Sequence, residues 1–167
     1  ADVRLGASPP TPPHAPRVVA LGSYAHDPAA IYARLLFHGP DFQVIRRMVG
    51  VSDDAAEAEL NGIREQGWRP NGWITDMAAG DGGLQLAVLW SRAALGGASL
   101  PTGIEAMRPY GVPSAGPVRG VLTGRKRDGK RTLSDVMLID SAGRVYAELL
   151  GVELHKLAAG EYPGKSG

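Results

Sequence analysis

The sequence predicts an α+β fold in which a curved antiparallel sheet wraps around one long buried helix. The residues from about Gly82 to Leu95 are apolar on nearly every face of a helix, so other structure must cover them. Several β-rich runs follow this segment and are separated by hairpin signals, which is typical of antiparallel strands. A length of 167 residues fits one domain with a sizeable core.

The elements before the long helix are predicted from turn and cap signals. Residues 1–16 are interpreted as the tail of a preceding unit and an extended proline-rich linker, and residues 17–167 as a single domain. Asp27 is a candidate N-cap and Pro28 suits the first helical position, so we expect a short helix from there to about Leu36. Two strands are then expected over 42–51 and 55–60, followed by a loop over 67–75.

The elements after the long helix are predicted to be strands. Gly96-Gly97 is a helix stop. Four strands are expected over 104–110, 118–126, 132–140 and 144–156. The turns Asp128-Gly129 and Ser141-Ala142-Gly143 join the last three strands into hairpins.

The composition excludes several classes of function. A net charge of +1 argues against an electrostatic binder of nucleic acid or of a membrane surface, and the basic cluster over 125–131 is expected to be a solvated hairpin tip. The chain has no cysteine, so disulfides, thiolate metal sites and a cysteine nucleophile are excluded. No apolar run reaches the roughly 18 residues of a membrane span. The expected location is therefore cytoplasmic.

Asp81 and Gln85 are the candidate functional pair within the long helix. Their spacing of four residues places them on one side of the helix, one above the other. We expect Asp81 at the head of the helix, where burial would raise the pKa of its carboxyl and let it act as an acid. The structural alternatives are an N-cap or first-turn carboxylate at Asp81 and a satisfied core amide at Gln85.

Three ordered motifs resemble the C-terminal half of the dehydratase domain of polyketide synthases and polyunsaturated fatty acid synthases. They are the run from Ile31 to Gln43 with its Phe-His-Gly-Pro-Asp-Phe core, Asp81 with Gln85, and Leu100-Pro101-Thr102-Gly103-Ile104. The resemblance implies a double hotdog, in which two long helices are each wrapped by a curved sheet. It also implies removal of water from a β-hydroxyacyl thioester carried on the phosphopantetheine of an acyl carrier protein, with no bound metal or redox cofactor.

The resemblance also implies roles for individual residues. Asp81 matches the acid that protonates the leaving hydroxyl, and Gln85 matches the residue that orients it. Six further positions match elements that line or pack near the substrate tunnel: His38, Gly39, Pro40, Phe42, Leu100 and Pro101. The chain departs from the family pattern at His38, where modular synthases have tyrosine, and at Thr102 and Ile104. A packing role for His38 is as plausible as a substrate contact.

The family's base, a histidine in a His-x-x-x-Gly-x-x-x-x-Pro motif on the first hotdog, has no match in this chain. None of its four histidines has glycine four residues later. We therefore expect a C-terminal hotdog that supplies the acid of a split site. The base would come from a second hotdog, either a preceding domain or another copy. The alternatives are a non-catalytic acyl-binding or scaffold hotdog and a hotdog thioesterase.

Overall fold

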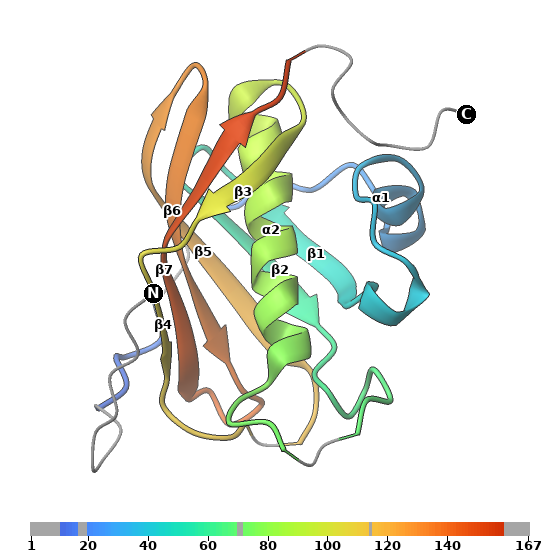
Figure 1. The fold of residues 1–167 in the computed structure, drawn as a ribbon, viewed down its shortest axis with the longest axis vertical. Helices are drawn as coiled ribbons and strands as arrows, with labels where there is room; N and C mark the ends of the chain where they lie inside the picture. The colour runs from blue at the N-terminus through green and yellow to red at the C-terminus, as the bar shows by residue number, and fades with distance from the viewer. Residues whose placement is uncertain (1–10, 17–19, 70–71, 114, 159–167) are drawn as a thin grey trace.

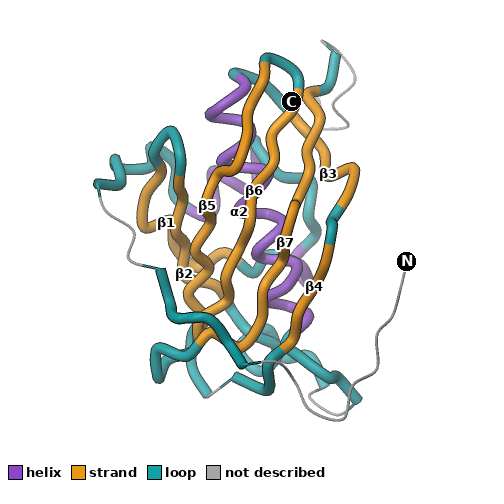
Figure 2. Tube along the Cα trace, turned by 90° about the vertical axis from the view of Figure 1, so that its left-hand side faces the viewer, coloured by secondary structure: helices purple, strands orange, loops and turns teal. Residues whose placement is uncertain are grey.

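The protein is a seven-stranded antiparallel sheet packed against one long helix, α2, which spans Met77–Leu95 (Figure 1). The computed structural model describes residues 11–16, 20–69, 72–113 and 115–158. The strands lie in the order β1-β2-β5-β6-β7-β3, and β4 also pairs with β7 (Figure 2). The strands are β1 Ile45–Val51, β2 Ala55–Leu60, β3 Ser99–Gly103, β4 Ala106–Pro109, β5 Val118–Asp128, β6 Arg131–Ile139 and β7 Val145–Lys156. This is the hotdog arrangement, and it confirms the predicted fold class.

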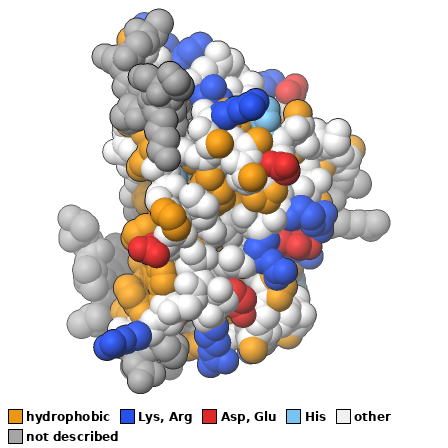
Figure 3. All heavy atoms as spheres, turned by 90° about the vertical axis from the view of Figure 1, so that its right-hand side faces the viewer, with side chains coloured by type: hydrophobic (Ala, Val, Ile, Leu, Met, Phe, Trp, Pro, Cys, Tyr) orange, Lys and Arg blue, Asp and Glu red, His pale blue; other side chains and the backbone are white. Residues whose placement is uncertain are grey.

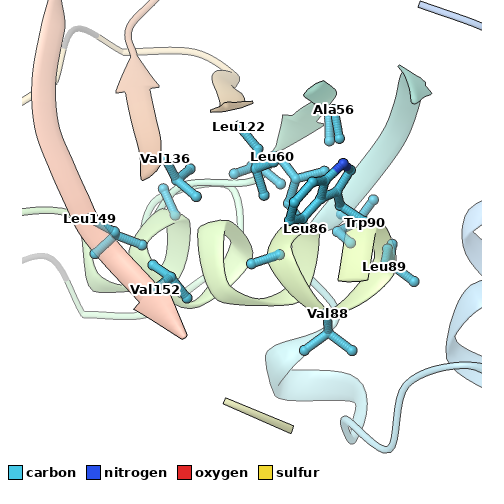
Figure 4. Close-up of a cluster of buried hydrophobic side chains, with 14 of the residues drawn as sticks. Ala56, Leu60, Leu86, Val88, Leu89, Trp90, Leu122, Val136, Leu149 and Val152 are labelled. Atoms are coloured by element: carbon cyan, nitrogen blue, oxygen red, sulfur yellow. The ribbon is translucent and has the colours of Figure 1, made fainter. Parts of the chain in front are cut away.

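The core lies between α2 and the sheet. Leu86, Leu89 and Trp90 of the helix are almost completely buried. They belong to one apolar cluster with side chains from four strands, namely Ala56, Leu60, Leu122, Val136, Leu149 and Val152 (Figure 4). Full burial of a large apolar side chain contributes about 1.5–3 kcal/mol, so the helix and the sheet stabilise each other.

The long helix begins earlier than the sequence predicts. Its N-cap is Asp76, whose carboxylate accepts a hydrogen bond from the backbone N–H of Ala79 at 2.9 Å. Gly80, Gly82 and Gly83 lower the helix propensity of this segment, so the sequence does not predict the first turn of the helix. Asp81 therefore lies in the second turn and does not cap the helix. The predicted stop is correct, because Gly96 has the left-handed conformation with φ 61°.

The sheet's edge also differs from the prediction. The strand expected over 104–110 is the shorter β4, and β3, which lies just before it, is not predicted from the sequence. The two strands pair with opposite ends of β7. Between them the N–H of Glu105 donates to the carbonyls of Leu150 and Gly151, where Gly151 has φ 60°. This bulge bends an edge strand that includes Pro101 and Pro109, residues that a central strand would not tolerate.

The segment before β1 contains two short helices. The helix α1 spans Pro28–Arg34, and the carboxylate of its predicted N-cap, Asp27, accepts from the N–H of Ala30. A single 3₁₀ turn, η1, then occupies Pro40–Phe42, so β1 begins three residues later than predicted.

The predicted tail over 1–10 lies outside the described residues. Residues 11–16 have no regular secondary structure and are mostly exposed. No helix in the described part of the chain is long and apolar enough to cross a membrane.

Gly124 on β5 provides a test of the packing between helix and sheet. A Cβ at this position would lie 2.5 Å from Cζ2 of Trp90, a rigid buried ring. We expect Gly124→Ala to lower the free energy of unfolding by about 1–3 kcal/mol. Gly129 is the matched control, because nothing described lies within 4 Å of its added Cβ. Urea unfolding of both variants measures the difference, and equal stabilities would contradict this packing.

Candidate functional site

Asp81 stands on α2 beside the loop that precedes β1. Its side chain is 30% exposed, so the carboxyl is reachable from solvent and is less buried than the sequence analysis expects. Oδ2 of Asp81 accepts a hydrogen bond from Nε2 of Gln85 at 2.7 Å. The spacing of four residues therefore places the two side chains in contact.

Gln85 is buried and makes three hydrogen bonds. Its Nε2 donates to Asp81 and also to the backbone carbonyl of Phe42, each at 2.7 Å. Its Oε1 accepts from the hydroxyl of Tyr32 at 2.7 Å. The amide thus joins α2 to α1 and η1, and it is both the satisfied core amide that was one alternative and a direct partner of Asp81.

Tyr32 is a site residue that the sequence analysis does not single out. It lies on α1, and its hydroxyl also accepts a hydrogen bond from the backbone N–H of Ile45 at 2.7 Å. Burial, together with the nearby charge of Asp81, raises the pKa of Tyr32 to about 12. The hydroxyl therefore keeps its proton at neutral pH. Tyr32 falls within the first of the three motifs, but its spacing gives no sign that its hydroxyl reaches Gln85.

His38 faces the same carboxylate. Its Nε2 lies 3.9 Å from Oδ2 of Asp81, and its side chain is 15% exposed. The ring stacks on Phe37 with centroids 4.6 Å apart. Burial lowers the pKa of His38, and the charge of Asp81 opposes this effect only in part. Its Nδ1 is buried and has no hydrogen-bond partner in the described part of the chain. The imidazole is therefore neutral near pH 7 and stands next to the acid.

The loop over 38–43 is held by side chains from two directions. Gln43 donates to the carbonyl of His38 at 3.2 Å, while Gln66 donates to the carbonyls of Pro40 and Asp41. The indole N–H of Trp68 also donates to Asp41. These bonds fix the backbone carbonyl of Phe42 that receives the Gln85 amide. Gly39 and Pro40, as N-cap and first residue of η1, form the turn that allows this approach.

An aromatic wall of three rings begins at Phe42, the residue whose backbone carbonyl accepts from Gln85. The ring of Phe42 is 47% exposed and contacts Trp68 edge-on, with centroids 5.2 Å apart. Trp68 in turn lies 6.3 Å from Trp73. On the side of the molecule that carries α1, hydrophobic side chains break up the charged surface (Figure 3). An apolar chain could lie along such a surface.

The structure does not bring Leu100 and Pro101 to Asp81. Both lie on β3, paired with His155 and Leu154 of β7, and β3 passes the C-terminal half of α2 (Figure 1). Asp81 lies in the N-terminal half. Within the described residues, no three His, Asp or Glu side chains form a group that could hold a metal ion.

Residues 10–163 match the family model described as the polyketide synthase dehydratase N-terminal domain. The chain therefore belongs to the polyketide synthase dehydratase family. No curated protein sequence matches the chain.

Three similar solved structures share the fold. A structure reported for dehydratases of type I polyketide synthases is 22% identical, with a TM-score of 0.68 over 85% of this chain. A pyran synthase domain from the sorangicin pathway is 20% identical, with a TM-score of 0.65 over 91% of this chain. The dehydratase domain of PpsC from Mycobacterium tuberculosis, in complex with C12:1-CoA, is 22% identical, with a TM-score of 0.63 over 86% of this chain. This chain spans 54%, 60% and 56% of those three chains, in the same order.

The buried imidazole of His38 predicts an acid-sensitive contribution to stability. Because the folded-state pKa is lowered, the unfolded chain binds the proton more readily, and stability falls as the pH drops below about 6.5. We expect His38→Gln to flatten the pH dependence of the free energy of unfolding between about pH 7 and 5. Urea unfolding of wild type and variant across this range measures the effect. If the two plots of unfolding free energy against pH are parallel, the pKa of His38 is the same in the folded and unfolded chain.

Proposed function

We propose that this chain is the C-terminal hotdog of a β-hydroxyacyl thioester dehydratase domain in polyketide or polyunsaturated fatty acid biosynthesis. The observation that carries the proposal is the solvent-accessible Asp81, bonded to Gln85 in a chain of the dehydratase family. The substrate would be an acyl chain on the phosphopantetheine arm of an acyl carrier protein. The exposed ring of Phe42, whose backbone carbonyl bonds to Gln85, begins an aromatic wall that supports binding of its apolar part.

The assignment to the C-terminal half rests on which motifs of the family the sequence contains and which it lacks. The matched family description names an N-terminal domain. The acid and glutamine nevertheless occur with the spacing expected of the second hotdog, whereas the histidine motif of the first hotdog is missing from the sequence. These two features favour the second half.

In the proposed reaction, a base on the other hotdog removes the α-proton of the thioester. The electron pair of that C–H bond forms the α,β double bond as the β-carbon–oxygen bond breaks. Asp81 gives its proton to the departing hydroxyl, which leaves as water. The products are an enoyl thioester, a protonated base and the Asp81 carboxylate. Loss of one proton from the base to solvent and uptake of one proton by the Asp81 carboxylate restore the site.

A second hotdog would also cover the edge of this one. Ile104, between the edge strands β3 and β4, is 44% exposed, and Met107 on β4 is 37% exposed. Met107 lies beside Gly80 of α2, so this apolar surface continues from the sheet's edge onto the helix. An edge strand with unpaired backbone groups is a natural site for pairing. A preceding domain or a second copy would supply the partner.

Asp81→Asn tests the acid. We expect the variant to fold normally and to lose dehydration by on the order of a hundredfold or more, because asparagine cannot donate a comparable proton. Enoyl thioester formation from a β-hydroxyacyl thioester is measured in a polypeptide extended to include a second hotdog. Glu59→Gln is the matched control, since Glu59 pairs with Arg47 on the sheet, away from this site. Near wild-type turnover by Asp81→Asn would remove Asp81 from the mechanism.

The need for a second hotdog is tested by comparing this chain alone with the extended polypeptide. We expect this chain alone to self-associate and to show no dehydration, because the family's base motif is missing from its sequence. Light scattering measures association, and the enoyl thioester assay measures turnover. A stable monomer would contradict the association, and robust turnover lost in His38→Gln would place the base in this hotdog. Release of free acid would indicate a thioesterase, and acyl binding without any reaction would indicate a scaffold.

A further inference from the structure

The hydrogen bonds around Gln85 run in one direction, and two backbone groups set that direction. At one end the N–H of Ile45, which can only donate, bonds to the hydroxyl oxygen of Tyr32. At the other end the carbonyl of Phe42, which can only accept, receives Nε2 of Gln85. Between these ends every donor and acceptor has a determined role.

The direction decides how the amide of Gln85 faces Asp81. Because Tyr32 accepts from Ile45, its own O–H is free to be donated, and it points at Oε1 of Gln85. The amide nitrogen of Gln85 must then face Asp81 and Phe42. An amide turned by 180° would place Oε1 against the carbonyl of Phe42, which is also an acceptor, so Phe42 and Tyr32 together hold the amide in this orientation.

We propose that Tyr32 is a positioning residue that fixes the orientation of the Gln85 amide and thereby determines which oxygen of Asp81 carries the proton for transfer. The proposal rests on the proposed dehydratase function. With the amide N–H bonded to Oδ2, the transferable proton resides on Oδ1. In the described part of the chain Oδ1 receives no hydrogen bond, and His38 also faces Oδ2.

The surroundings of Tyr32 suit this role. Its hydroxyl is buried against the same apolar cluster as Tyr24, and its raised pKa keeps it protonated over the range in which the enzyme would work. Tyr32 therefore remains a donor to Gln85 at every relevant pH. Without the hydroxyl of Tyr32, Oε1 of Gln85 loses its partner, and the amide is held in line with Asp81 from one side only, by the carbonyl of Phe42.

Tyr32→Phe tests the proposal in the extended polypeptide. We expect kcat for dehydration to fall about ten- to hundredfold with KM unchanged, because the acid is misdirected while the binding surface is intact. Tyr24→Phe is the matched control, because Tyr24 packs on the same core and no hydrogen bond of its hydroxyl occurs among the described residues.

A double-mutant cycle with Gln85→Ala separates positioning from packing. If Tyr32 acts through the amide, Tyr32→Phe has little further effect on kcat once Gln85 is alanine. An equal fall of kcat in both backgrounds would overturn the proposal. Thermal unfolding of all variants identifies any loss of folded protein, so that kcat refers to folded enzyme.

A readout that does not need activity keeps this inference distinct from the proposed function. In ¹⁵N NMR spectra of this chain, we expect the side-chain amide of Gln85 to be protected from exchange in wild type and in Tyr24→Phe. In Tyr32→Phe the same amide should lose protection and change its shifts. Unchanged amide signals would overturn the role of Tyr32. If the wild-type extended polypeptide forms no enoyl thioester, the proposed function is wrong. The amide signals still decide, independently of that result, whether Tyr32 positions Gln85.

Discussion

The apolar surface of α2 is the constraint on which the rest of the structure depends. Most of the helix cannot face water, so the sheet must cover it, and β2, β5, β6 and β7 all contribute side chains to its core. The sheet cannot enclose the whole helix. Met77, Asp81 and Leu84 lie on the partly uncovered stripe, at helical spacing. A polar group on this helix is tolerated where the stripe meets solvent, and Asp81 stands there.

The parts of the fold that local signals determine are predictable from the sequence. Alternating strands, hairpin turns and the glycine stop at Gly96 predict β5, β6, β7 and the end of α2. The start of α2 was predicted wrongly, because the glycines on both sides of Asp81 lower the helix propensity while tertiary packing stabilises the first turn. At the edge of the sheet, β4 was predicted but β3 was missed, since only its pairing with β7, beyond a bulge opposite Gly151, reveals it as a strand.

The site was predictable only in part. Helical spacing brings Asp81 to Gln85, and the motif around His38 and Phe42 identifies the loop beside them. The contribution of Tyr32 depends on a contact across 53 positions, which no local pattern encodes. The fold does not determine the reaction either, since one similar structure is a pyran synthase domain and others are dehydratases. Individual side chains around α2 therefore carry the functional argument.

Because α1 is short, the site can lose its structure while the rest of the fold remains intact. A helix of seven residues is too short to persist in water by itself, so α1 stays helical only while it is docked, chiefly through Ile31. When it lifts away, Gln85 loses its link to Tyr32, yet α2 and the sheet keep their own core. Such a local opening requires less free energy than global unfolding. Warming or mild denaturant would thus remove the support of Gln85, and with it the activity of Asp81, in molecules whose circular dichroism spectrum is still that of the native fold.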